Sequence, residues 1–242
     1  MSDVFQIAAV GLLEAKQRVE AVSLNAANAS VPGYRRHVVV GRAFDPALVA
    51  VEPAAAPDSA TRASAHLVDL QRGGLVTSGR NLDLAIDAND AFFALTDGLQ
   101  TWLTRAGAFR VNDEGVLVGE GGLRVIGTQG DLRLPGSDVV VAPDGRITHD
   151  GLVVGTVQLF SPNDRSSLQA AQGALLVAAD GIDAIEPGDA PIRSGALEAS
   201  NTDAGREMLS LMAISRQFES LSRVLQGYDE LLGRTIQKLG GV

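Results

Sequence analysis

Near its start the chain spaces apolar and small residues in alternating steps of three and four. These residues are Phe5, Ala8, Leu12, Ala15, Val19, Val22, Ala26 and Ala29. The spacing places them on one face of an α-helix, as in the a and d positions of a heptad repeat. Pro32 should end the helix, because proline lacks a backbone N–H and disfavours helical backbone at the preceding residue. We therefore expect an N-terminal helix within residues 1–35.

The end of the chain repeats this spacing more strongly. Its members are Leu211, Ile214, Phe218, Leu221, Leu225, Tyr228, Leu232 and Leu239, with Thr235 as the polar exception. Residues 200–203, Ser-Asn-Thr-Asp, offer N-cap side chains, and Gly240 with Gly241 provides a stop. A helix over 202–239 would be about 55 Å long, so much of its apolar face needs another helix as partner. Segment 191–242 is expected to carry this helix, packed on the N-terminal one.

Between the two helical segments the pattern changes to a period of two. Residues 82–87 alternate apolar and polar side chains, and 108–118 and 139–148 each read as two short strands around a turn. Residues 151–160 add at least one further strand. This pattern predicts an all-β domain over 71–190.

Residues 36–70 are expected to connect the first helix to the β domain. Positions 51–64 within them are rich in Ala and Pro, which is typical of an extended connector. The predicted fold class is therefore α+β, with long terminal helices that form a coiled coil and a central all-β domain.

Composition and charge exclude several classes of protein. A formal net charge of −9 without a basic run argues against nucleic-acid binding. The chain has no cysteine, which excludes disulfides and thiolate chemistry. Asp3 stands where a signal peptide would carry a basic residue, and no apolar stretch approaches the roughly 20 residues of a membrane span. We expect no cleavable signal peptide and no direct membrane insertion.

A search for catalytic or metal-binding groups yields little. The three histidines, His37, His66 and His149, show no metal-ligand spacing. Asp83, Asp87 and Asp90 lack the central glycine and terminal glutamate of a calcium loop, so they are interpreted as solvent-facing strand positions.

Glycine-rich and serine motifs point the same way. Residues 119–122, Gly-Glu-Gly-Gly, precede a strand pattern where a phosphate loop would precede a helix. No Gly-x-Ser-x-Gly motif occurs. The sequence therefore predicts no catalytic residues, no cofactor, no metal and no enzymatic activity.

The exit from the first helix carries a familiar motif. Residues 24–35 read Leu-Asn-Ala-Ala-Asn-Ala-Ser-Val-Pro-Gly-Tyr-Arg. They resemble the signature A-N-N-[LI]-A-N-x-[ST]-T-x-G-[YF]-[KR] of the flagellar rod and hook protein family. The matching positions are Asn25, Ala27, Asn28, Ser30, Gly33, Tyr34 and Arg35. Ser23, Leu24, Ala26 and Val31 depart from it.

Three further segments resemble the same family in the same order. Residues 77–86 are similar to T-G-N-P-L-D-L-A-I, and 92–93 with 104–109 to G-F-F and T-R-x-G-x-F. At the end, 200–203, 216–219 and 229–232 resemble S-N-V-D, Q-R-x-[YF]-E and D-E-M-L. The resemblance thus covers both ends and much of the middle.

The resemblance implies a structural subunit of the bacterial flagellar rod that assembles helically and transmits torque. The terminal helices would form an inner coiled-coil domain (D0), and the β domain an outer one (D1). Implied partners are other rod and hook subunits, further copies of the chain, and the flagellar type III export apparatus. The implied location is the periplasmic rod of the basal body. By length the chain is most similar to proximal rod members, with distal rod or hook members as the alternative.

An unrelated coiled-coil adhesin or phage tail subunit is the other open interpretation of the helical pattern. For a rod subunit, the candidate residues are those of an assembly interface. They are Asn25, Asn28, Gly33, Tyr34, Leu211, Phe218, Leu221, Leu225 and Leu232. The first four would set the backbone geometry of the helix exit, and the rest would supply apolar contact.

Overall fold

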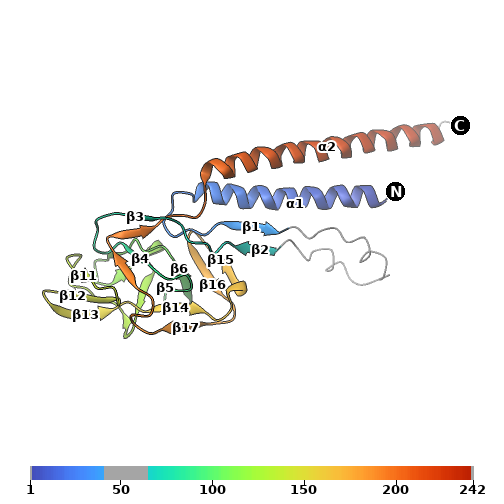
Figure 1. Cartoon of the computed structure of the whole chain (residues 1–242). Helices are drawn as coiled ribbons and strands as arrows, with labels where there is room; N and C mark the ends of the chain where they lie inside the picture. The colour runs from blue at the N-terminus through green and yellow to red at the C-terminus, as the bar shows by residue number, and fades with distance from the viewer. Residues whose placement is uncertain (1, 41–64, 241–242) are drawn as a thin grey trace. The chain divides into compact units, whose positions relative to one another are not determined.

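The computed structural model describes residues 2–40 and 65–240 (Figure 1). They divide into two compact units. The helical unit comprises 2–26, 38–40, 65–66 and 204–240, and the β unit comprises 27–37 and 67–203. The expected combination of terminal helices with a mostly β central region is confirmed.

Two long helices dominate the helical unit. Helix α1 spans Ser2–Ala27 and α2 spans Ala204–Gly240. They lie side by side and run in opposite directions (Figure 1). At Gly11 a methyl group would touch Leu221 Cδ1 at 3.4 Å, so the helices approach closely there. Within the described part of the chain, no helix is both long and apolar enough to span a membrane.

The remaining elements are short strands. They are β1 (His37–Val40), β2 (Ala65–Val68), β3 (Leu75–Thr77), β4 (Leu84–Ile86), β5 (Phe92–Thr96), β6 (Thr101–Thr104), β7 (Arg110–Val111), β8 (Leu117–Val118), β9 (Arg124–Gly127), β10 (Gly130–Asp131), β11 (Val140–Val141), β12 (Arg146–His149), β13 (Leu152–Thr156), β14 (Leu159–Pro162), β15 (Leu168–Ala170), β16 (Leu175–Ala178), β17 (Ile182–Ile185), β18 (Ile192–Ser194) and β19 (Ala196–Glu198). Short 3₁₀ turns occur at Glu120–Gly122 and Arg165–Ser167.

The largest sheet has the order β15-β16-β6-β5-β9-β8-β7, and β10 extends it on β9. Strand β14 pairs with both β5 and β17. Smaller sheets are β11-β12-β13, β18-β4, β19-β3 and β1-β2. The β7–β8 and β11–β12 pairs are antiparallel, which confirms both predicted hairpins. Strands β13 and β14 confirm the strand expected in 151–160.

Two local expectations were wrong. Asp83 is 1% exposed and the whole of β4 is buried, so residues 82–87 do not alternate between core and solvent. The cause is cover on both sides: β18 pairs along β4, and Gly107 packs against the backbone of Leu84. The segment 191–203 is not helical, because its β18 and β19 pair with β4 and β3.

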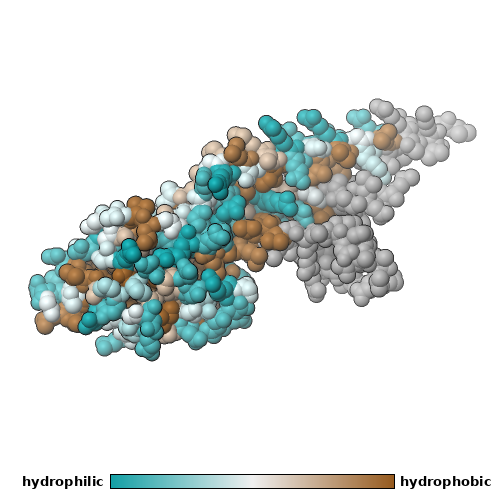
Figure 2. All heavy atoms as spheres, viewed as in Figure 1, coloured by the Kyte–Doolittle hydropathy of each residue, from teal (hydrophilic) through white to brown (hydrophobic). Residues whose placement is uncertain are grey.

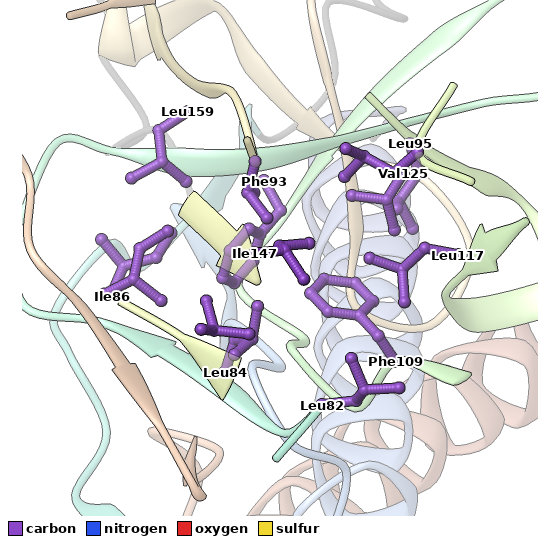
Figure 3. Packing of buried hydrophobic residues seen from close by; sticks show 14 of the residues in the cluster. Leu82, Leu84, Ile86, Phe93, Leu95, Phe109, Leu117, Val125, Ile147 and Leu159 are labelled. Carbon is purple, nitrogen blue, oxygen red and sulfur yellow. The ribbon is translucent and has the colours of Figure 1, made fainter. Parts of the chain in front are cut away.

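The core of the β unit lies on both faces of β5. Phe93 and Leu95 belong to the larger apolar cluster, in which Phe93 meets Phe109 edge to face at 5.0 Å (Figure 3). Phe92 and Ala94 belong to a second cluster. Alternate residues of a strand point to opposite faces, so a strand buried on both sides must be apolar throughout. The burial of β5 fixes the position of the neighbouring β6 and of the residues that follow it.

Candidate functional site

The chain leaves α1 through a tight turn that ends at Gly33. The Val31 N–H donates to the Asn28 carbonyl at 3.0 Å, and Gly33 adopts a φ of 71°. The Gly33 N–H donates to the Glu198 carbonyl at 2.7 Å. A Cβ at Gly33 would lie 2.1 Å from the Ala106 nitrogen, so this position admits no side chain.

The two residues after Gly33 are buried in the β unit. Tyr34 is 1% exposed, and its ring stacks on His37 with centroids 5.5 Å apart. Arg35 is equally buried, and its Nη2 donates to Glu198 Oε1 at 2.5 Å. The helix exit is therefore attached to β19, which lies more than 160 residues further along the chain.

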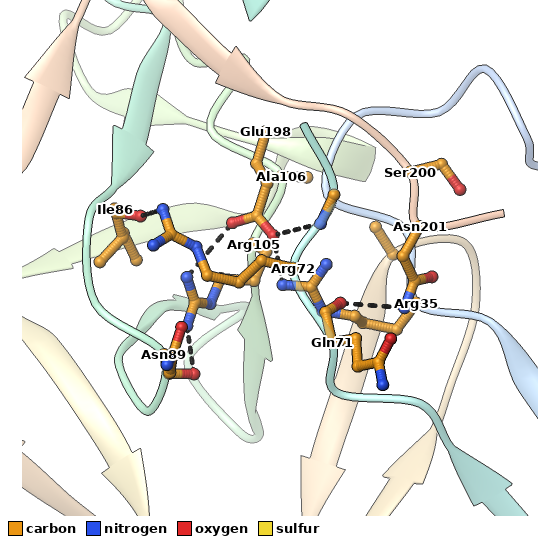
Figure 4. Close-up of polar contacts among 12 residues, drawn as sticks. Arg35, Gln71, Arg72, Ile86, Asn89, Arg105, Ala106, Glu198, Ser200 and Asn201 are labelled. Carbon is orange, nitrogen blue, oxygen red and sulfur yellow. Dashed lines mark hydrogen bonds and ion pairs between the residues drawn. The ribbon is translucent and has the colours of Figure 1, made fainter. Parts of the chain in front are cut away.

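Arg105, which follows β6, approaches the same carboxylate from the other side. Its Nη1 donates to Glu198 Oε2 at 3.2 Å (Figure 4). Its Nη2 donates to the carbonyls of Ala88 and Asn89 at 2.6 and 2.5 Å. The guanidinium also lies 4.8 Å from the centroid of the Phe92 ring. We call Arg35, Arg105 and Glu198 the Glu198 cluster.

Burial makes the charges of the Glu198 cluster interdependent. Desolvation lowers the pKa of Arg105 to about 10, while the attraction of Glu198 opposes that shift. Arg105 therefore remains a cation at neutral pH, with Glu198 as its counter-ion. Removing one partner of a buried ion pair is costly because the other charge is left in a low dielectric.

Asn201 adds polar contacts beside the cluster. Its Oδ1 accepts from the Arg36 N–H at 2.7 Å, and its Nδ2 donates to the carbonyl of Asp69 at 2.9 Å. Its Nδ2 also donates to the carbonyl of Gln71 at 3.0 Å (Figure 4). One amide side chain thus joins the segment after Tyr34 to the segment before β3. This satisfies backbone groups that no sheet pairs.

The motifs that resembled the rod family meet around this cluster. Gly33 and Arg35 come from the helix-exit motif, Arg105 from the Thr-Arg motif, and Asn201 from the Ser-Asn motif. Sequence reasoning missed Glu198 because no motif contains it. One signal was available: Arg35 and Arg105 lie in separate motifs, and neither motif contains an acidic residue that could pair with its arginine.

The structure places the other predicted interface residues less uniformly. Asn25 is buried and Asn28 half-buried. Leu211, Leu221 and Leu225 are half-buried, and Phe218 is 42% exposed. The side chain of Leu232 lies outside the described residues. Contact of these residues with another subunit stays a prediction.

The helical unit exposes further large apolar side chains (Figure 2). They are Val10, Leu13 and Leu24 on α1, and Met208, Leu209, Met212, Val224 and Leu231 on α2. Apolar surface gathered on two adjacent helices is typical of a site of protein–protein contact. In the described part of the chain, no three His, Asp or Glu side chains gather into a metal site.

Known proteins resemble this chain over most of its length. Residues 193–238, from β18 into α2, match the family described as flagellar basal body rod FlgEFG protein, C-terminal. The basal-body rod protein FlgF of Caulobacter vibrioides is 28% identical over 94% of each chain. FlgG of the same bacterium is 30% identical over 95% of this chain and 97% of its own. Escherichia coli FlgF is 30% identical over 89% of each.

These relatives carry the names of rod components. Their similarity spans both helices and the β unit, and it includes the segment that supplies Glu198 and α2. The chain therefore belongs to the flagellar basal-body rod protein family, in which it is FlgF-like and is a structural protein, not an enzyme.

Proposed function

We propose that this rod subunit uses α1 and α2 as a coiled-coil domain, D0, that packs against the helices of neighbouring subunits. The β unit forms the outer domain, D1. Head-to-tail contacts that do not close into a ring generate a helical tube, which is the geometry that a rod needs to transmit torque.

Incomplete burial of the helical seam supports this proposal. Leu211, Leu221 and Leu225 belong to the heptad pattern of α2, and Leu221 lies against Gly11 of α1, yet each of the three keeps part of its surface exposed. Ala15 and Val22 on α1 are buried. Two helices bury only one stripe of each other, so the remaining apolar surface is left for helices of other chains.

The Glu198 cluster supports the stiffness of such a subunit. It holds the residues that follow α1 in the chain, and β19, which precedes α2, against the same strand end. Both ion pairs, Arg35–Glu198 and Arg105–Glu198, are buried. Rotation of these segments would break ion pairs in a low dielectric, which resists shear.

The proposed partners are other rod and hook-family subunits, with self-association included, and the proposed location is the periplasmic rod of the basal body. Passage through the flagellar type III export apparatus as an unfolded chain fits helices whose stability depends on packing. The proximal, FlgF-like position is favoured, and similarity to FlgG keeps a distal, FlgG-like position as the alternative.

Leu225→Asp tests the helical contact. A carboxylate in the apolar seam should prevent incorporation into the rod and leave cells without flagella. The β unit should keep its stability within about 0.5 kcal/mol, because Leu225 belongs to the helical unit. Motility, the presence of the chain in isolated basal bodies, and circular dichroism of the purified protein are the measurements.

Gln226→Asp is the matched control, since Gln226 is exposed on the same turn of α2. It introduces the same charge without removing an apolar contact and should leave cells motile. Normal swimming with Leu225→Asp, or equal defects in both variants, would contradict the assignment of this face to the inner helical contact.

A further inference from the structure

Strand β3 lies at the outer edge of a two-stranded ribbon. It pairs with β19 along one side, and within the described residues no strand pairs with its other side. The far side of β19 is occupied, because the N–H groups of Gly195 and Ala196 donate to the Asp83 carbonyl at 2.9 and 3.3 Å. Every residue from 74 to 80 is exposed. Strand β3 therefore presents one open edge to solvent.

The hydrogen bonds to β19 decide which backbone groups face the open edge. The Gly74 carbonyl accepts from the residue after β19 at 2.7 Å, and the Ser78 N–H donates to the residue before β19 at 2.8 Å. Successive residues of a strand direct their backbone groups to opposite sides. Val76, midway between Gly74 and Ser78, therefore faces β19, while Leu75 and Thr77 face away from it. The N–H and carbonyl groups of these two residues are left unpaired in the described part of the chain.

This edge lacks the features that protect an exposed strand. Edge strands are commonly blunted by charged residues, prolines or β-bulges. Residues 73–79 read Gly-Gly-Leu-Val-Thr-Ser-Gly, with no charge and no proline. By contrast, a register shift interrupts the pairing of β13 with β12, and β17 carries Asp183. The edge of β3 is thus open to the addition of a further strand.

The open edge is complementary to itself. When two copies of β3 run antiparallel with Val76 opposite Val76, Leu75 of each copy lies opposite Thr77 of the other. Residues paired in this way exchange both of their hydrogen bonds, so the two pairs supply about four in all. The flanking residues 73, 74, 78 and 79 are glycine or serine, which leaves room for close approach.

The side chains add an apolar row to this backbone match. Val76, which is 57% exposed, pairs with Leu197 across the ribbon, so both side chains point to the same face. In the antiparallel arrangement the two Val76 side chains become neighbours, and the row continues to Leu197 on either side. A two-stranded ribbon is marginally stable by itself, whereas further strands with an apolar face stabilise it.

Charge at the ends of the run is balanced within each copy. Arg72 and Arg80 flank residues 73–79, and the antiparallel arrangement brings Arg72 of one copy toward Arg80 of the other. Arg72 pairs with Asp87 at 3.3 Å, and Arg80 pairs with Asp83 at 3.7 Å. Each arginine thus has a counter-ion in its own chain, which reduces the repulsion between copies.

We propose that β3 of this chain pairs with β3 of a second copy and joins two ribbons into one antiparallel sheet. The contact is two-fold symmetric, since both copies use the same surface. The short strand of Leu75–Thr77 buries less surface than a permanent dimer needs, so the dimer is weak and exchanges with monomer.

The symmetry of this contact separates it from the rod contact proposed above. Copies in an open helical array all point the same way, whereas a two-fold axis reverses one copy relative to the other. The dimer therefore belongs to free subunits. There it covers an unprotected edge that would otherwise recruit strands from further chains.

Cysteine cross-linking of the purified full-length chain tests the contact. The natural chain has no cysteine, so an introduced thiol is the sole one. Opposite residues in a pair without hydrogen bonds have Cα atoms about 4.5 Å apart, which a disulfide can span. Val76→Cys should therefore form disulfide-linked dimers under a mild oxidant. Val153→Cys is the matched control, because Val153 is a strand valine that is 58% exposed. Its dimer yield should be roughly tenfold lower, since the edge of β13 is interrupted.

Thr77→Pro in the Val76→Cys chain separates strand pairing from chance contact of exposed thiols. Proline removes the Thr77 N–H, which faces the open edge, and leaves the hydrogen bonds between Val76 and β19 in place. The disulfide yield should fall roughly tenfold. The urea midpoint of unfolding should stay unchanged, which checks that the β unit remains folded.

Sedimentation velocity of cysteine-free chains measures the same contact without an oxidant. The natural chain should show a dimer whose fraction rises with concentration. Val76→Lys should abolish this dimer, because two like charges would lie directly opposite each other. Val153→Lys, at matched exposure, should retain it.

Three results would overturn the proposal. Equal dimer fractions in the two lysine variants would assign the association to another surface. Equal disulfide yields at positions 76 and 153 would show only random collision of exposed thiols. A natural chain that stays monomeric at every concentration would leave the β3 edge to a strand of another protein.

Discussion

At the scale of single residues, Gly107 and Gly33 are among the positions where the surrounding backbone leaves no space for a side chain. A Cβ at Gly107 would lie 1.7 Å from the Leu84 carbonyl oxygen, and one at Gly33 would lie 2.1 Å from the Ala106 nitrogen. In both cases the neighbour is backbone, which cannot swing aside as a side chain can. These glycines let two strands of chain approach to the distance at which the Glu198 cluster forms.

Gly33→Ala should destabilise the β unit by about 3 kcal/mol or more. The left-handed backbone costs about 1–2 kcal/mol for alanine, and the clash with Ala106 adds to it. Urea unfolding followed by tryptophan fluorescence measures the change. Gly79→Ala is the control, because Gly79 has a φ of 76° but nothing within 4 Å of its Cβ position. Equal losses in the two variants would show that space at Gly33 does not matter.

At the scale of elements, a single carboxylate joins parts of the chain that no sheet pairs directly. Glu198 closes β19, Arg105 follows β6, and Arg35 follows the turn after α1. The Gly73 N–H also donates to Glu198 Oε1 at 3.2 Å. The cluster therefore sets the relative position of these elements within the β unit.

Glu198→Gln should cost about 3–5 kcal/mol of unfolding free energy. The side chain keeps its size, but two buried guanidinium groups lose their counter-ion. Glu186→Gln, at an exposed position on the same unit, should change stability by less than about 0.5 kcal/mol. Comparable thermal unfolding of wild type and Glu198→Gln would mean that the buried charges are compensated elsewhere.

At the scale of the whole molecule, ion pairs at the surface make the stability of the β unit depend on pH. Asp87 follows β4 and accepts from Arg193 on β18 at 2.8 Å and from Arg72 at 3.3 Å. The hydrogen bond from Arg193, followed by that from Arg72, lowers the pKa of Asp87 below its usual 3.8. The folded state therefore holds this proton less tightly than the unfolded state does.

The sign of the pH effect follows from that difference. A carboxyl whose pKa is lowered by folding contributes stability that is complete above the unfolded value and is lost as pH falls through the folded value. The difference in unfolding free energy between wild type and Asp87→Asn should stay constant above about pH 5 and shrink below 3.8. Urea titrations at several pH values measure it. Arg193→Gln should show the same trend, and a difference independent of pH would refute the assignment.

The sequence by itself determined the features that depend on residues close together in the chain. The alternating steps of three and four predicted both helices, because residues three and four apart lie on the same face of a helix in adjacent turns. Turn residues at 112–115 and 143–145 predicted both hairpins for the same reason. Four motifs in order indicated the rod family, which the known relatives confirm.

Only the tertiary structure decided what depends on distant parts of the chain. Asp83 is buried because β18, more than 100 residues later, pairs beside it along β4. Glu198 became the centre of a polar cluster because folding brings Arg35 and Arg105 to it. Periodicity reports which face of an element is apolar, but not which segment will cover it. That choice is made by packing, where pairings between remote residues compete for the same surface.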